Sequence, residues 1–189
     1  QKMSLAGISA ALGELLKVQR FAPDIGVGHS AGAAILARMA LDHVFDPDVL
    51  VSLNGALLPL PGVLGHVFSP MAKLLALNPF APKLVAWRAL DAQSVSRLIA
   101  GTGSRLDEHG TQLYSRLVQN PEHVRAVLDM LAGWDLHSLE RDLPRLEVPV
   151  TLVAADQDRT VPPVESARVA RMLKRALVSG LPAAPKPAG

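Results

Sequence analysis

A serine flanked by glycines is the residue of this sequence with the clearest chemical potential. Residues 25–32 read Ile-Gly-Val-Gly-His-Ser-Ala-Gly, which contains the pattern Gly-x-Ser-x-Gly centred on Ser30. Gly28 and Gly32 would give the space for the sharp, crowded turn on which a nucleophilic serine is held. We therefore predict that Ser30 is a nucleophile and that the amide of Ala31 donates to the oxyanion formed during its attack.

The same stretch also fits two other interpretations. One is a dinucleotide-binding turn, because the pattern Gly-x-Gly-x-x-Ala begins at Gly26. The acid that such a turn requires about twenty residues later would have to be Asp46 or Asp48, but both precede the next predicted strand instead of ending it. The other is an ordinary tight turn between a strand and a helix. We favour the nucleophile because it also accounts for Ser30.

A second group of polar residues follows an apolar, β-branched run near residue 150. The stretch Thr151–Pro163 predicts a buried strand that ends in a loop with two aspartates. The carboxyl end of a parallel strand is where an α/β sheet places groups that must reach a site. An acid there would hold a histidine in the right tautomer and stabilise its imidazolium form. Asp158 is our candidate and Asp156 the alternative, and capping of the loop by both is a third interpretation.

The histidine that would complete this site is missing from its expected place. In this arrangement the chain order is serine, acid, histidine, so the base should follow the acid. We expect His29 to shape the pocket beside the nucleophile, with Asn54 as a second pocket residue, and histidines such as His66 and His137 to lie at the surface or at helix ends. We therefore predict that this chain is inactive as a serine-dependent enzyme. All six histidines precede Asp158: His29, His43, His66, His109, His123 and His137.

The elements expected around these residues alternate between strand and helix. An amphipathic helix over 5–18 is followed by a short buried strand at 25–27, a helix over 33–41 and a buried strand over 49–53. A strand over 148–155 and a helix over 164–177 continue the pattern. Parallel strands that alternate with helices predict an α/β fold. Because the sequence opens on a helix, we expect the N-terminal strands of that fold to be missing.

The segment between the two α/β parts has a different residue pattern. Prolines separate amphipathic stretches there and no convincing strand is seen, which predicts an inserted helical cap. The expected cap helices cover residues 70–77, 82–90, 92–100, 106–119 and 121–131. The predicted organisation is a first core part at 1–56, the cap at 57–143, a second core part at 144–178 and a disordered tail at 179–189.

The composition is that of a folded protein without a strongly charged surface. Of the 189 residues 49% are hydrophobic and 19% are charged, and the net charge is +2. Basic residues are scattered singly, which gives no support for nucleic-acid binding. The absence of cysteine excludes a disulfide framework and a thiolate metal site and is compatible with the cytoplasm, where we expect the protein. No stretch is long and apolar enough for a transmembrane segment.

Two levels of resemblance to known families support this fold class. The stretch around Ser30 together with Asp158-Arg159-Thr160-Val161-Pro162 resembles the α/β-hydrolase superfamily. More specifically, the chain resembles the α/β-hydrolase-fold magnesium-chelatase accessory proteins of bacteriochlorophyll biosynthesis. The segments that carry this second resemblance are VGHSAGAAILARMALD, SLNGALLPLPG, FSPMAKLLALNPF, RLIAGTGSRLD and LERDLPRLEVP.

The resemblance implies a function near magnesium insertion into protoporphyrin in a photosynthetic bacterium, with the cap covering the site. It assigns the nucleophile to Ser30 and the acid to Asp158. It implies a small-molecule substrate or a tetrapyrrole-like ligand, the magnesium-chelatase subunits as partners, and no cofactor or metal ion. A complete version would be a serine hydrolase. The alternatives are a general serine esterase and a non-catalytic protein that binds a tetrapyrrole or the chelatase.

Three departures from the family pattern bear on catalysis. Ala155 stands where the family has a glycine, and the family's final strand and glycine-histidine turn are replaced after Val178 by Ser-Gly-Leu-Pro. A second oxyanion donor would come from a loop before Gln1. We interpret these departures as an incomplete chain at both ends, or as a reading-frame shift near Ser179.

Overall fold

The computed structural model describes residues 3–59, 78, 80–88, 91–101, 106–158 and 160–182. The chain divides into two compact units, which we call the core unit, residues 4–59 and 135–189, and the helical unit, residues 60–134. The core unit thus includes residues 135–143, which the sequence analysis placed in the cap. These residues join the core unit because their leucines are buried there, as shown below.

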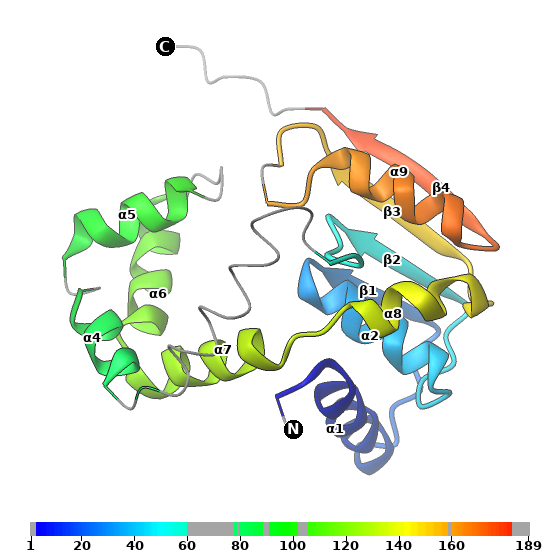
Figure 1. Cartoon of the computed structure of the whole chain (residues 1–189), viewed down its shortest axis with the longest axis horizontal. Helices are drawn as coiled ribbons and strands as arrows, with labels where there is room; N and C mark the ends of the chain where they lie inside the picture. Colours follow the sequence, from blue (N-terminus) through cyan, green and yellow to red (C-terminus); the bar gives the residue numbers. More distant parts are fainter. Residues whose placement is uncertain are drawn as a thin grey trace. The chain divides into compact units, whose positions relative to one another are not determined.

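The core unit contains a parallel four-stranded sheet with the order β1-β2-β3-β4 (Figure 1). Its register sets His29 beside Leu53, and Leu53 beside Val153. All strands run in the same direction, so the residues that follow their carboxyl ends share one edge of the sheet. The strands are β1 (Ile25–His29), β2 (Val49–Leu53), β3 (Val150–Ala155) and β4 (Ala176–Leu181).

Helices cover one face of this sheet within the described part of the core unit. Helix α2 (Ala31–Leu41) contacts β1 and β2, and α9 (Pro163–Met172) contacts β3 and β4 (Figure 1). Only alternate residues of β1 are therefore buried, with Gly26 and Gly28 inside. The apolar pattern predicts a buried strand, but Ile25 and Val27 are 56% and 59% exposed. They point to the face that α2 leaves uncovered.

Small side chains let the first two helices pack closely. Helix α1 (Leu5–Val18) begins at Ser4, whose side chain accepts a hydrogen bond from the amide of Gly7. Its buried residues include Ser9 and Gly13, and the Ser9 hydroxyl donates to the carbonyl of Ile35 in α2 at 3.3 Å. Helix α2 presents four buried alanines and Met39 to its neighbours. This alanine-rich helix, predicted over 33–41, is confirmed and is the element that follows Ser30.

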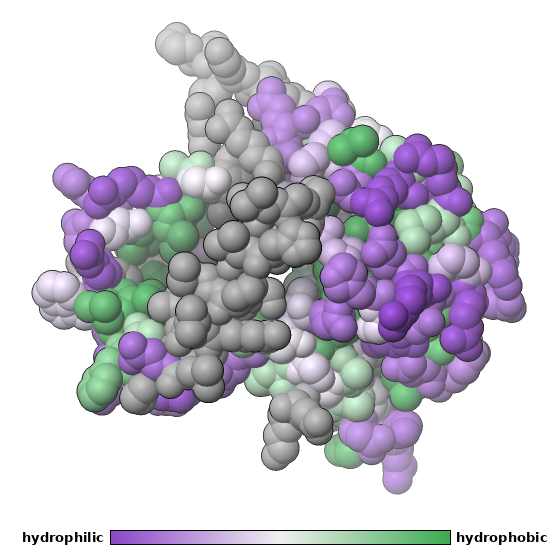
Figure 2. Space-filling model, in the orientation of Figure 1, coloured by the Kyte–Doolittle hydropathy of each residue, from purple (hydrophilic) through white to green (hydrophobic). Residues whose placement is uncertain are grey.

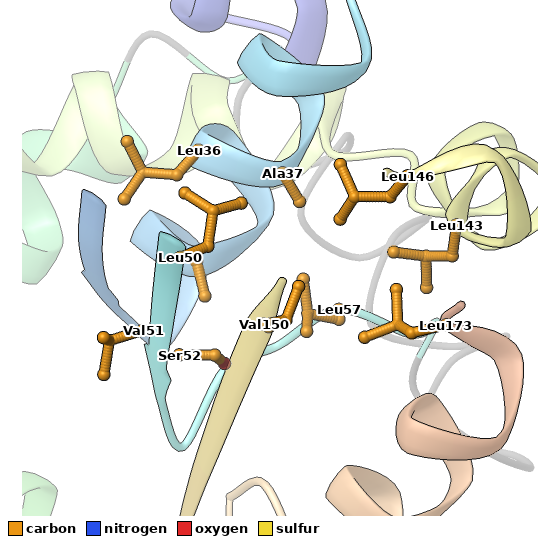
Figure 3. A pocket seen from close by; sticks show the side chains of 11 residues that line it. Leu36, Ala37, Leu50, Val51, Ser52, Leu57, Leu143, Leu146, Val150 and Leu173 are labelled. Carbon is orange, nitrogen blue, oxygen red and sulfur yellow. The ribbon is translucent and has the colours of Figure 1, made fainter. Parts of the chain in front are cut away.

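An apolar centre joins the sheet to the short helices that precede β3. Helix α8 (His137–Asp142) and the 3₁₀ helix η1 (Leu143–Arg145) bring in Leu139 and Leu143, both of which are completely buried. Figure 3 shows Leu143 beside residues of the strands and of the loop after β2, around a small apolar cavity. The cavity lining includes Leu57, Leu143, Val150 and Leu173.

The carboxyl-terminal end of the core unit differs from the prediction. The sequence pattern predicts one helix over 164–177, but α9 ends at Met172 and β4 begins at Ala176. Strand β4 pairs with β3 along its whole length, from Ala176 beside Val150 to Leu181 beside Ala155. Backbone pairing to an existing strand outweighs the weak helical preference of this segment. The predicted start of the tail at residue 179 is also wrong, because residues 179–181 belong to β4, and residues 183–189 lie outside the described residues.

The helical unit contains four described helices. Helix α4 packs on α7, and α6 packs on both α5 and α7. Its small apolar centre is formed by Val95 and Ile99, with Val118 beside them. The four helices correspond to the last four predicted for the cap, whereas the predicted helix at 70–77 lies outside the described residues. They are α4 (Ala81–Arg88), α5 (Ala92–Gly101), α6 (Glu108–Val118) and α7 (Pro121–Gly133).

The outer surface of the core unit is polar on the side seen in Figure 2. Hydrophilic side chains (purple) predominate there, with apolar side chains (green) between them. None of the helices in the described ranges has the length and apolar character needed to cross a membrane.

An ion-pair network ties α2 to α8. The largely buried guanidinium of Arg38 donates to Asp142 at 2.7 Å and to both carboxylate oxygens of Asp42 at 2.6 and 3.0 Å. The hydrogen bond from Arg38 holds the pKa of Asp142 below its usual value. The hydrogen bond between Arg38 and Asp142 thereby joins α2 to α8, across 104 positions of the chain.

Replacing Asp142 by asparagine should destabilise the core unit at neutral pH and have little effect in acid. At pH 7 the free energy of unfolding should fall by about 1–2 kcal/mol, because a charge-assisted hydrogen bond is lost. The folded pKa is lowered, so this stabilisation is complete above about pH 4, the value for an unfolded aspartate, and vanishes as the pH falls through the folded value. Urea denaturation at decreasing pH, followed by circular dichroism, measures the difference.

The exposed residue Asp46 offers a matched control, since Asp46→Asn removes the same charge without a side-chain hydrogen bond among the described residues. A stability difference for Asp142→Asn that stays constant down to strongly acidic pH would contradict the expectation.

Candidate functional site

Ser30 lies between the end of β1 and the first residue of α2, as the sequence predicted. Its backbone has φ 51° and ψ −118°, a positive φ that residues other than glycine rarely adopt. Such strain persists where the surrounding structure enforces it. Ser30 occupies the capping position of α2, yet its side chain makes no capping hydrogen bond. The hydroxyl is therefore not used to hold the helix.

The two glycines of the motif have different structural roles. A Cβ atom on Gly28 would lie 2.5 Å from the backbone nitrogen of Ala33 and 2.6 Å from the carbonyl carbon of Gly32. These are backbone atoms of the following helix and cannot move aside, so Gly28 is required for the turn. A Cβ atom on Gly32 would have no described atom within 4 Å. The sequence pattern predicts the same role for both glycines, and the structure supports it only for Gly28.

The backbone of Ser30 is fixed to the loop that follows β2. Its amide donates to the carbonyl of Leu53 at 3.1 Å, and its carbonyl accepts from the amide of Ala56 at 3.0 Å. Gly55 lies against α2, because a Cβ atom there would be 2.7 Å from the Cβ of Ala33. The turn that carries Ser30 is thus held by the neighbouring strand end as well as by its own helix.

The two candidate acids have different surroundings. The half-buried carboxylate of Asp158 accepts hydrogen bonds at Oδ1 from the amides of Thr160 at 2.7 Å and Val161 at 2.9 Å. At Oδ2 it accepts from the side-chain amide of Asn54. Asp156 is exposed, and its backbone amide donates to Leu181 of β4, on the side away from β2. The geometry therefore favours Asp158 over Asp156 as the acid, because Asp158 is hydrogen-bonded to Asn54 in the loop after β2, and this loop also bonds to Ser30.

Asn54 connects the two halves of the site. From the sequence it is predicted, like His29, to be a pocket residue, without a named partner. In the structure it follows β2 with a φ of 44°, and its Oδ1 accepts from the amide of Ala155 at 2.8 Å while its Nδ2 donates to Asp158. The one signal in the sequence was an asparagine directly after a buried strand, a residue type that tolerates positive φ.

The histidines do not complete the site within the described residues. His29 is exposed at the end of β1, His43 follows α2, and His137 begins α8 with its Nδ1 3.9 Å from Glu140. His109 and His123 belong to helices of the helical unit, and His66 lies outside the described residues. Among the histidines that the structure describes, none forms a hydrogen bond with Ser30 or Asp158.

Chemically, the edge of the sheet combines a hydroxyl, helix amides and a fixed carboxylate. The amide of Ala31 is the first of α2 and has no acceptor within the helix, so it is available to a developing negative charge. The same amide position is where a nucleophile turn supplies one oxyanion donor. A proton acceptor between Ser30 and Asp158 would be needed for the hydroxyl to become a strong nucleophile.

Comparison with known proteins agrees with this architecture. The family model described as "Alpha/beta hydrolase family" matches residues 4–185. The chain is 40% identical over 175 residues to the magnesium-chelatase 30 kDa subunit of Rhodobacter capsulatus. The aligned region covers 93% of this chain and 61% of that protein. The chain thus spans about three fifths of the length of this relative.

Solved structures of low sequence identity share the fold. An alpha/beta hydrolase fold protein from Burkholderia ambifaria superimposes with a TM-score of 0.72 at 18% identity, over 95% of this chain and 65% of that one. An esterase from Exiguobacterium antarcticum gives 0.68 at 12% identity, over 95% and 66%. The predicted α/β class is confirmed, and the similarity to the chelatase-related protein agrees with the resemblance found in the sequence. This chain belongs to the alpha/beta hydrolase family.

Proposed function

We propose that this chain acts with magnesium chelatase in bacteriochlorophyll biosynthesis, in the cytoplasm, and binds a tetrapyrrole-like ligand. The observation that carries the proposal is the 40% identity to the magnesium-chelatase 30 kDa subunit over 93% of this chain. The fold alone would not select this function, since α/β hydrolase folds carry many unrelated activities. The magnesium-chelatase subunits are the partners that follow from the name of this relative.

Magnesium insertion into protoporphyrin tests this proposal directly. Added to purified magnesium chelatase with ATP and Mg²⁺, the chain should bind the chelatase and raise the initial rate of magnesium protoporphyrin formation, followed by fluorescence. An equal amount of heat-denatured chain serves as the control for non-specific protein effects. If the chain neither binds the chelatase nor changes the rate, the proposed function is wrong.

A second candidate is hydrolysis of an acyl ester at Ser30, and the strained backbone of this residue favours it. In that reaction the Ser30 oxygen attacks the acyl carbon and loses its proton to a base, while the Ala31 amide binds the oxyanion. The acyl group remains on Ser30 as the alcohol leaves with a proton, and water then releases the acid. Asp158 would orient the imidazole that serves as this base.

Labelling by a fluorophosphonate probe separates the two candidates. We expect no labelling of Ser30 in this chain, because no described histidine forms a hydrogen bond with its hydroxyl and the serine keeps the reactivity of an ordinary alcohol. A longer version with a histidine after Asp158 should be labelled if it is an esterase, and the label should be lost in Ser30→Ala. Strong labelling of the present chain at Ser30 would contradict the assignment of an incomplete site. A Ser30→Ala chain that stimulates the chelatase as well as the unsubstituted chain would support the accessory function.

A further inference from the structure

Asn54 forms three hydrogen bonds to the next strand and the loop that follows it. Its backbone amide donates to the carbonyl of Val153 at 2.8 Å. Its side-chain Oδ1 accepts from the amide of Ala155 at 2.8 Å, and its Nδ2 donates to Oδ2 of Asp158. Both ends of a short carboxamide are therefore used, one on the strand end and the other on the acid.

The carboxylate of Asp158 has one oxygen fully occupied and one partly occupied. Its Oδ1 accepts two backbone amides, from Thr160 and Val161. Its Oδ2 accepts only from Asn54 among the described residues, and a carboxylate oxygen has room for about two hydrogen bonds. One acceptor position of Oδ2 is left. The amides of Thr160 and Val161 hold the other oxygen, and Asn54 is the described residue that holds Oδ2.

The loop that contains Asn54 is also the loop that holds the nucleophile position. Leu53, the last residue of β2, and Ala56, two residues after Asn54, form the backbone hydrogen bonds to Ser30 at 3.1 and 3.0 Å. A short, hydrogen-bonded path thus runs from Ser30 through this loop to the carboxylate of Asp158. Asn54 provides the link in that path that is made by a side chain.

We propose that Asn54 is a positioning residue that orients Asp158 relative to Ser30, so that the remaining acceptor position of Oδ2 is kept open for an N–H donor such as an imidazole, which none of the described histidines supplies. The inference rests on the proposed assignment of Asp158 as the acid of a serine site. A carboxamide suits this role because it supplies a donor to the acid and an acceptor to the strand end on one short side chain. Aspartate has no donor when it is ionised, and glutamine is longer by one methylene group.

Asn54→Asp separates positioning from a purely structural role. The new carboxylate keeps the size of the side chain and its acceptor for the Ala155 amide. It loses the donor to Asp158 and places two negative charges together, which is unfavourable. The Ala155 amide should therefore keep its acceptor and its protection, whereas the amides that donate to Asp158 should lose protection if Asn54 orients this carboxylate.

Amide hydrogen exchange of the ¹⁵N-labelled chain, measured by NMR, gives the first readout. The amides of Thr160 and Val161 donate to Asp158, so their exchange reports on the carboxylate. We expect both to exchange about tenfold faster in Asn54→Asp, with unchanged protection in β1, where global unfolding would be seen. Unchanged exchange at Thr160 and Val161 in a folded Asn54→Asp protein would overturn the proposal.

The side-chain amide signal of Asn54 gives a second readout that does not depend on substituting it. Asp158→Asn replaces the charged acceptor by a neutral one, and the proton on Nδ2 should shift upfield. The matched control is Asp156→Asn, which removes the same charge from the exposed neighbour and should leave this signal in place. The proposal would be overturned if the chemical shift of this proton stays the same in Asp158→Asn, or if it changes in Asp156→Asn instead. Neither readout involves the chelatase, so a negative result for Asn54 can be told apart from a failure of the proposed function.

Discussion

Replacing Gly28 by alanine should lower the free energy of unfolding by about 3 kcal/mol or more, while the same change at Gly32 should be harmless. At Gly28 the new methyl group would overlap the backbone of Gly32 and Ala33, with distances of 2.5 to 2.6 Å. Relief would require α2 to move away from β1, against the packing of its buried alanines. No rotation of a side chain can relieve a clash with the main chain.

Gly32→Ala is the matched control for this substitution. It introduces the same methyl group two residues from Ser30, within the first turn of α2, where no described atom lies within 4 Å. Alanine should even stabilise the helix by about 0.5–1 kcal/mol. Urea denaturation of the two variants beside the unsubstituted chain measures the contrast. Similar stabilities for both variants would mean that the turn is not packed as described.

The sequence predicted the first half of the core unit well because local and long-range preferences agree there. A β-branched apolar run, a glycine turn and an alanine-rich stretch each favour the structure that the segment adopts in the fold. The position of Ser30 could be predicted from this context. The position of Asp158 could be predicted because it comes shortly after the carboxyl end of a strand. The difference between Gly28 and Gly32 could not be predicted from the sequence, since it depends on which of the two glycines packs against backbone atoms at the start of α2.

The errors arose where pairing and packing decide between weak local preferences. The segment 176–181 contains alanine, leucine and serine, and it is a strand because β3 offers a parallel edge next to it. The boundary of the cap at residue 143 was wrong for a related reason, because amphipathic helices look alike whichever core they join. The hydrogen bond between Asn54 and Asp158 could likewise not be predicted, because the two residues lie 104 positions apart in the chain.

The placement of Ser30 and its reactivity as a nucleophile depend on different groups. The strained turn, the amide of Ala31 and the fixed carboxylate of Asp158 are features of the backbone and its near neighbours, and the described residues contain all three. A serine becomes a strong nucleophile only through a base, which these features do not supply. Ser30 can therefore keep its geometry in a protein whose function is to bind a ligand or a partner.

Truncating Leu143 to alanine should cost the core unit about 3 kcal/mol, because its side chain is completely buried and borders an existing cavity (Figure 3). Leu177→Ala is the matched control in the same unit, with a side chain that is 64% exposed in β4, and should cost less than about 1 kcal/mol. Native-state hydrogen exchange at Leu50 and Leu152 reports on the sheet. If Leu143 belonged to the helical unit, these strand amides would keep their protection in Leu143→Ala, whereas a leucine of the core unit must lower it.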